Sequence, residues 1–230
     1  AYAVVTYHTA WLKAHHCAAF MAATMSSDMD NTDSVKIFYE DTIANKVKVL
    51  GPDVNASNYR FEPVDRSTIR YGLGAVKGTG EQAVNVILKA READGPFKDL
   101  FDFCRRCDKR MVNRRTIEAL IKAGAFDSIA PSTGSGQADR HKLLASTGIA
   151  MDFAEQAERN AMQTSLFDIG TNAEEHAPQY VAVKPWDEKE KLMQEKTALG
   201  FFFSGHPYNS SKKELSRFIR RPLNRLEPAK

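Results

Sequence analysis

The feature that most constrains the fold is a glycine-punctuated turn that runs directly into an amphipathic helix, within residues 71–91. Gly78 and Gly80 allow the backbone to pass close to another group. The apolar residues that follow recur at helical spacing and predict one buried face: Ala83, Val84, Ile87 and Leu88. The turn therefore presents free backbone amides at the start of a helix.

This turn is a candidate anion site. The free amides, the positive end of the helix dipole and the Lys77 side chain would all attract a phosphate or a carboxylate. The candidate ligands are Lys77, Gly78, Thr79 and Gly80. The alternative is a helix cap and turn that binds nothing, and the basic sequence that follows favours the anion site.

The same spacing also matches the dinucleotide fingerprint, Gly78-x-Gly80-x-x-Ala83. That fingerprint requires a parallel strand after the helix, whereas here Gly95 and Pro96 lead into a second helical pattern. A nicotinamide-dependent oxidoreductase stays open as an alternative and predicts thermal stabilisation by the cofactor. The better match is with the helix-hairpin-helix family, which residues 71–91 resemble. That resemblance implies hairpin amides that bind DNA backbone phosphates without reading bases.

A second predicted helical pair follows at once and carries a cluster of bases at its turn. The six candidate DNA ligands are Arg105, Arg106, Lys109, Arg110, Arg114 and Arg115. A solvated charged face is the usual reason for such a run. Its position beside the first hairpin favours a duplex whose backbone touches both turns. Few aromatic residues interleave with these bases, so stacking on single strands is disfavoured.

Composition bounds the class of protein. The chain has 230 residues, 43% of them apolar, and a net charge of +3, which suits a globular chain with one or two cores. Charge is uneven, because residues 98–122 carry eight Lys or Arg against four Asp or Glu, and residues 149–176 carry six acids against one Arg. The three cysteines and the lack of a signal peptide or membrane-length apolar run predict a cytoplasmic location.

The element pattern predicts a mainly α fold with a small β ribbon. Short alternating runs at residues 47–50, 59–61 and 68–71 are typical of strands. Helices are expected over residues 2–25, 32–44, 100–107, 116–123, 143–160, 188–197 and 212–221, in addition to the one after the glycine turn. The first of these is apolar nearly all round, which is typical of a buried helix or helix pair in a larger protein whose packing partners lie outside this chain.

No catalytic or metal-binding set is predicted. The six histidines lie apart in the sequence, and Cys104 and Cys107 form a Cys-x-x-Cys half-site without a second half. A nucleotidyl-transferring site needs closely placed aspartates that hold two Mg²⁺ ions, and no predicted strand carries them. Asp28 and Asp30 lie on a polar loop and are not favoured as metal ligands.

A short apolar pair stands in the acidic region. Residues 163–167 read Gln-Thr-Ser-Leu-Phe and resemble the motif by which bacterial polymerases bind the sliding clamp. Leu166 and Phe167 would fill an apolar pocket, Gln163 would set the register by hydrogen bonds, and Ser165 lies between them. A buried loop anchor is the alternative. Residues 162–183 are expected to be irregular.

Taken in order, the motifs resemble the alpha-subunit family of bacterial replicative DNA polymerase III, the C family. They include the segments that begin at Asp28, Gly51, Tyr71, Asn113, Ala123 and Gly205. The resemblance implies that residues 1–57 end a fingers domain and residues 58–130 form a tandem helix-hairpin-helix domain on duplex DNA. It further implies that residues 131–183 are a linker with the clamp-binding motif and that residues 184–230 lead to an OB-fold outside this chain.

The same resemblance implies a function. The parent would be a DNA-directed DNA polymerase that uses Mg²⁺, and its catalytic palm would lie outside this chain, so this chain alone should be inactive and needs no cofactor. Expected partners are duplex DNA, the sliding clamp (beta subunit) and, through absent regions, other replicase subunits. The alternative is a non-enzymatic helix-hairpin-helix module of a repair or scaffold protein.

Overall fold

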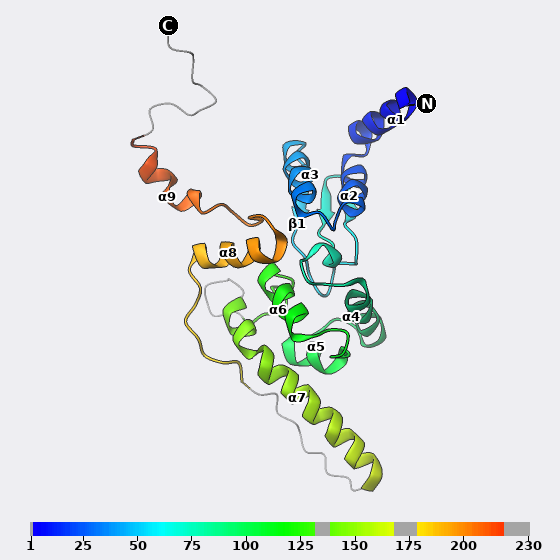
Figure 1. Cartoon of the computed structure of the whole chain (residues 1–230), viewed down its shortest axis with the longest axis vertical. Coiled ribbons are helices and arrows are strands. Elements are labelled where there is room, and N and C mark those ends of the chain that lie inside the picture. Colours follow the sequence, from blue (N-terminus) through cyan, green and yellow to red (C-terminus); the bar gives the residue numbers. More distant parts are fainter. Residues whose placement is uncertain (1, 132–138, 168–178, 219–230) are drawn as a thin grey trace.

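A computed structural model describes residues 2–131, 139–167 and 179–218 of the chain. The fold of this part is mainly helical (Figure 1). Its helices are α1 (Tyr2–His15), α2 (Cys17–Ser27), α3 (Thr32–Ala44), the 3₁₀ helix η1 (Leu73–Ala75), α4 (Glu81–Asp94), α5 (Leu100–Arg106), α6 (Arg114–Ala123), α7 (Arg140–Phe167), α8 (Glu188–Leu199) and α9 (Tyr208–Leu215). None of these described helices is both long enough and apolar enough to span a membrane.

The predicted ribbon is a three-stranded sheet with the order β1-β3-β2. β1 (Lys48–Leu50) pairs in parallel with β3 (Thr68–Arg70), and β2 (Glu62–Asp65) pairs with β3 in the antiparallel sense. The strand predicted at residues 59–61 thus begins at Glu62. Pro63 is tolerated there because β2 is an edge strand, where the missing N–H group has no partner to lose.

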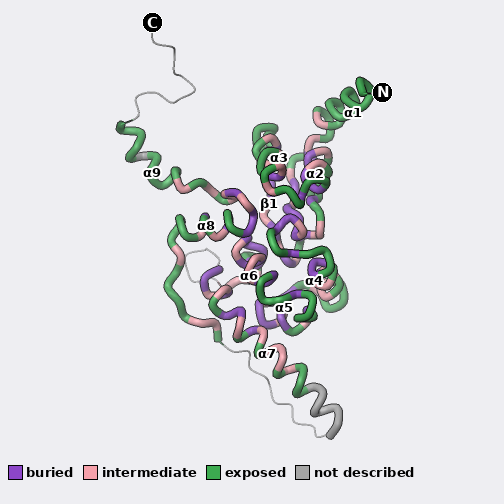
Figure 2. Tube along the Cα trace, in the orientation of Figure 1, coloured by how far each residue is buried: buried purple, intermediate pink, exposed green. Residues whose placement is uncertain are grey.

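A continuous core joins the sheet to the helices on either side (Figure 2). On one side Met21 and Met25 of α2 are buried against the sheet region. On the other, the Phe103 ring lies 4.9 Å from the Phe97 ring and 4.8 Å from the Phe126 ring, centroid to centroid. The domain boundary expected at residue 57 falls between β1 and β3, which are hydrogen-bonded neighbours in this sheet.

Local sequence explains where most helices begin and end. The Asn31 side chain accepts hydrogen bonds from the first amides of α3, and Asn113 does the same for α6. Gly124 ends α6 in the left-handed conformation with φ of 88°. A capping box between Asp187 and Glu190 starts α8. These helices begin and end within two residues of the predicted bounds.

α9 and α7 differ from the predicted bounds, and α1 is exposed within this chain. α9 spans Tyr208–Leu215, whereas the sequence predicts a helix over residues 212–221. α1 contains no buried residue, and Tyr2 and Tyr7 are exposed on it. Its apolar pattern fits a buried helix, but within this chain α1 projects from the body (Figure 1). α7 continues to Phe167, beyond the predicted end at residue 160, and its outer half projects from the opposite end of the molecule (Figure 1).

Gly72 lies where β3 passes into η1, and its backbone packs tightly against residues 59–61. A Cβ atom there would lie 2.5 Å from the carbonyl carbon of Arg60 and 2.7 Å from the carbonyl oxygen of Tyr59. We expect Gly72→Ala to lower the free energy of unfolding by about 2 kcal/mol, because the backbone has to shift. Gly80→Ala is the control, since its Cβ would meet nothing within 4 Å. Equal urea midpoints for the two variants would contradict the prediction.

Candidate nucleic-acid interface

The first hairpin is formed by η1, a turn at residues 76–80, and α4. Gly78 has φ of 86°, a conformation that side chains other than glycine rarely adopt. The buried Thr79 hydroxyl closes the turn by donating to the carbonyl oxygens of Leu73 and Val76, at 2.6 Å to each. Thr79 therefore supports the turn from inside, while Lys77, Gly78 and Gly80 are exposed.

α4 begins at this turn, and its first residues, Glu81 and Gln82, are exposed. The first N–H groups of an α-helix have no partner within the helix, so they and the helix dipole favour an anion. Glu81 in the first turn offsets part of this positive field. After α4, Gly95 leads into α5 rather than into a parallel strand, so the described fold does not supply the βαβ unit that a dinucleotide fingerprint requires.

The second hairpin joins α5 to α6 through residues 107–113. The Asp108 carboxylate accepts a hydrogen bond from the Arg110 amide at 2.8 Å, and the buried Val112 anchors the turn. The Thr116 hydroxyl, in the first turn of α6, donates to the Gly78 carbonyl oxygen at 3.3 Å. This contact places the two hairpins side by side, as the basic cluster in the sequence suggests.

The exposed bases of the two hairpins fall into two groups. Lys77, Arg110 and Arg115 have no ion-pair partner among the residues that the structure describes. The others are paired: Arg105 lies 3.5 Å from Asp102, and Arg114 lies 2.7 Å from Glu118. Lys109 is paired with two glutamates of α7. The unpaired group is the one that is free to meet an incoming phosphate.

Arg106 is a correction to the sequence-based site. Its side chain is only 10% exposed, and its guanidinium donates to the carbonyl oxygens of Ala90 and Gly95 and lies 4.5 Å from the centre of the Phe97 ring. It also pairs with Asp102 at 3.1 Å. Arg106 therefore holds the connection between α4 and α5 and does not face outward. The sequence could show only the Asp102 spacing, because the carbonyl partners come from another helix.

The electrostatics around Arg106 agree with this inward role. Burial raises the pKa of Asp102, but the Lys98 amide and the Arg106 guanidinium outweigh that effect and hold the pKa below its usual value. Burial raises the pKa of the Cys104 and Cys107 thiols to about 12, so both are neutral at pH 7. Among the described residues, no three His, Cys, Asp or Glu side chains are grouped to hold a metal ion.

Two further elements, α8 and the start of α7, stabilise the interface, although nothing in the sequence connected them with it. The Lys77 amide donates to the Ala198 carbonyl oxygen of α8 at 2.8 Å. At the far side of α6, Arg140 pairs with the buried Glu195 at 2.9 Å and with Asp127 at 2.6 Å. The residues predicted to bind a clamp, Gln163, Ser165, Leu166 and Phe167, lie in the last turns of α7, and their side chains fall outside the described structure.

Comparison with known proteins shows a family match over the two hairpins and similar proteins over nearly the whole chain. Residues 46–135 match the family described as helix-hairpin-helix motif, which covers both hairpins. The chain is 50% identical over 228 residues to DNA polymerase III subunit alpha of Neisseria meningitidis serogroup B, and the match covers 99% of this chain and 19% of that protein. Proteins of the same name from Vibrio cholerae and Escherichia coli K12 are 42% and 40% identical, over 100% and 95% of this chain and 20% and 18% of their own lengths.

Proposed function

We propose that this chain, a homologue of DNA polymerase III subunit alpha over nearly its whole length, binds the backbone of duplex DNA without sequence preference through its two hairpins. The chain spans 19% of the length of the Neisseria relative. That a complete protein containing this chain has polymerase activity is therefore a proposal as well. The reaction would be template-directed nucleotidyl transfer to a primer end, in a cytoplasmic replicase.

The single observation that carries the DNA-binding proposal is the contact between the Thr116 hydroxyl and the Gly78 carbonyl oxygen. It brings the start of α4 and the start of α6 together at one surface. Lys77, Arg110 and Arg115 stand at these two turns without ion-pair partners among the described residues. Backbone amides and lysine or arginine side chains recognise phosphate rather than base edges, which supports non-specific binding.

The chemistry of nucleotidyl transfer is assigned to residues outside this chain. Such a site holds two Mg²⁺ ions between carboxylates, and the described residues do not bring a set of carboxylates together. We therefore propose that other parts of a complete protein supply the palm and its Mg²⁺, while this chain binds the duplex. In this division of labour the chain alone has no polymerase activity.

We further propose that residues 163–167 dock on the sliding clamp. The proposal is supported by the Gln-x-x-Leu-Phe pattern and by the position of these residues at the outer end of α7, away from the hairpins. Docking at one site and DNA contact at another would raise the effective concentration of each for the other. Contacts with further replicase subunits are proposed for regions outside this chain.

A salt titration tests DNA binding. We expect the variant Lys77→Gln/Arg110→Gln/Arg115→Gln to bind a duplex at least about tenfold more weakly, and its plot of log affinity against log salt to be flatter by roughly 2–3, because each phosphate contact contributes about 0.9 to that slope. Fluorescence anisotropy with two duplexes of unrelated sequence, at several salt concentrations, measures both quantities.

The matched control is Lys46→Gln/Lys48→Gln/Arg66→Gln, which removes the same charge from exposed positions. These residues lie at the end of the sheet away from η1, since β3 runs from Thr68 toward Gly72. The control should keep nearly the wild-type slope. An equal loss in both variants, an affinity that does not depend on salt, or a strong preference for one duplex would contradict the proposal.

A further inference from the structure

We propose that α7 restrains the second hairpin through ion pairs to Lys109, an arrangement that we call the latch. In this proposal Glu155 and Glu158 hold Lys109 until a DNA phosphate displaces them, and duplex binding thereby releases the outer half of α7. The inference rests on the proposed DNA-binding function and adds a coupling between the hairpin and the helix that ends in residues 163–167.

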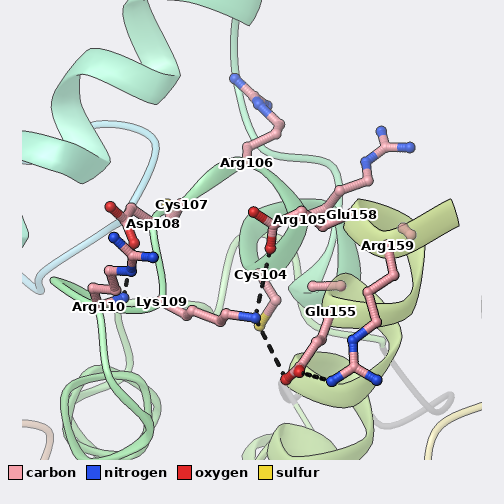
Figure 3. Close-up of a pocket in the computed structure, with 12 residues that line it drawn as sticks. Cys104, Arg105, Arg106, Cys107, Asp108, Lys109, Arg110, Glu155, Glu158 and Arg159 are labelled. Carbon is pink, nitrogen blue, oxygen red and sulfur yellow. Dashed lines mark hydrogen bonds and ion pairs between the residues drawn. The ribbon is translucent and has the colours of Figure 1, made fainter. Parts of the chain in front are cut away.

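The latch is visible in the groove between the hairpin and α7. The groove has a volume of about 920 Å³ and is lined by residues 104–110 on one side and by α7 on the other. Figure 3 shows the Lys109 side chain reaching across it to the two glutamates. The Lys109 Nζ atom lies 3.4 Å from a Glu155 carboxylate oxygen and 3.5 Å from a Glu158 oxygen. A base expected at the DNA surface is thus occupied by two acids of the chain itself.

The ion pairs stand where the apolar packing of α7 ends. Toward the start of the helix, Leu143 and Ala150 are buried, and the Phe153 ring meets the Phe101 ring of α5 at 6.1 Å. From Glu155 onward the described residues are half-buried or exposed, and the helix extends away from the body (Figure 2). The ion pairs of Lys109 with Glu155 and Glu158 therefore tie the projecting part of α7 to the hairpin.

The charges and the exposure of these side chains allow a DNA phosphate to replace the two glutamates as the partner of Lys109. A hydrogen bond and the charge of Lys109, with a further contribution from Arg159, hold the pKa of Glu155 below its usual value, so Glu155 is ionised at neutral pH. The side chains of Lys109 and Glu155 are each 40% exposed, and that of Glu158 is 60% exposed. Exposed ion pairs of this kind are weak and screened by salt. A duplex that brings several phosphates to the hairpins can therefore compete for Lys109.

Release has a consequence for the helix. An isolated helical segment is only marginally stable in water. The part of α7 beyond Glu155 would therefore fray more once Lys109 pairs with a DNA phosphate instead of with the two glutamates. The residues proposed to meet the clamp lie in this part. DNA on the hairpins would thus make the clamp-docking segment more mobile, and the two binding events would be coupled through Lys109.

Affinity measurements on the 230-residue chain test the competition. We expect Glu155→Gln/Glu158→Gln to bind duplex DNA about two- to tenfold more tightly at low salt, because Lys109 no longer has to leave its partners. The control Asp152→Asn removes one acid from an exposed position on the same helix. In a Lys109→Gln background the two glutamate substitutions should have no further effect, which separates the latch from a general change in charge.

Hydrogen exchange tests the release. In the wild-type chain, saturating duplex should speed the exchange of amides in residues 155–167, and in Glu155→Gln/Glu158→Gln these amides should already exchange fast without DNA. Unchanged duplex affinity in that variant, an equal gain in Asp152→Asn, a gain that persists with Lys109→Gln, or exchange in α7 that duplex does not alter would overturn the latch alone. A wild-type chain that binds no duplex would overturn the proposed function as well.

Discussion

Arg140→Ala is expected to lower the free energy of unfolding by about 3–5 kcal/mol, because it leaves a buried carboxylate without its counter-charge. Arg140 Nη1 lies 2.9 Å from Glu195, whose side chain is only 1% exposed, and its Nε atom donates to Asp127 at 2.6 Å. Burial lowers the pKa of Arg140, but the two carboxylates outweigh that effect and raise it. The pairing joins the start of α7 to α8 and to the residues after α6.

Urea unfolding followed by circular dichroism measures the loss. The control Arg159→Ala removes an arginine from the same helix, but that side chain is 71% exposed, so its ion pair with Glu155 is expected to contribute little to stability. Arg140→Met/Glu195→Gln removes both buried charges and should recover most of the stability, because the carboxylate that still loses its partner, Asp127, is 37% exposed and can be solvated by water. A loss below 1 kcal/mol in Arg140→Ala would show that the pairing is not important for stability.

Leu166→Ala/Phe167→Ala is expected to abolish binding to the sliding clamp and to leave duplex affinity unchanged. Burying each of these side chains in an apolar pocket contributes about 1.5–3 kcal/mol before the cost of ordering the segment. Losing both should therefore weaken binding about a hundredfold or more. Surface plasmon resonance with immobilised clamp measures this affinity, and anisotropy measures the duplex affinity.

Met162→Ala is the matched control for that experiment, since it truncates an apolar residue next to the Gln-x-x-Leu-Phe pattern without changing it. It should bind the clamp as the wild type does. Undiminished clamp binding by the double variant would refute docking through residues 163–167. A parallel loss of duplex affinity would instead indicate that the substitutions disturb α7 and its neighbours.

Local sequence was enough to predict most elements. The helix after the glycine turn ends at Asp94, followed by Gly95 with φ of 78°, and the second hairpin helix ends at Gly124. These features depend on caps and backbone conformation within a few residues. The mainly α fold with a small sheet and the buried positions Ala83, Val84 and Ile87 of α4 are likewise confirmed.

Predictions that required neighbours were less accurate. The acidic sequence after residue 160 did not reveal that α7 continues to Phe167, and the basic segment at residues 212–221 did not reveal that α9 begins at Tyr208. The six bases around the second hairpin looked alike in the sequence. Arg106 turned out to be directed inward, to carbonyl groups of Ala90 and Gly95, whereas Arg110 is exposed.

The glycine turn, the helix caps and the clustering of bases between residues 105 and 115 were determined by the sequence itself, because each depends on residues close together along the chain. Only the tertiary structure decided which of those bases are free. Lys109 meets Glu155 and Glu158, and Thr116 meets Gly78, through contacts between segments that are distant in sequence. Such contacts depend on how helices pack, and helical periodicity shows which face of a helix is buried but not which partner covers it.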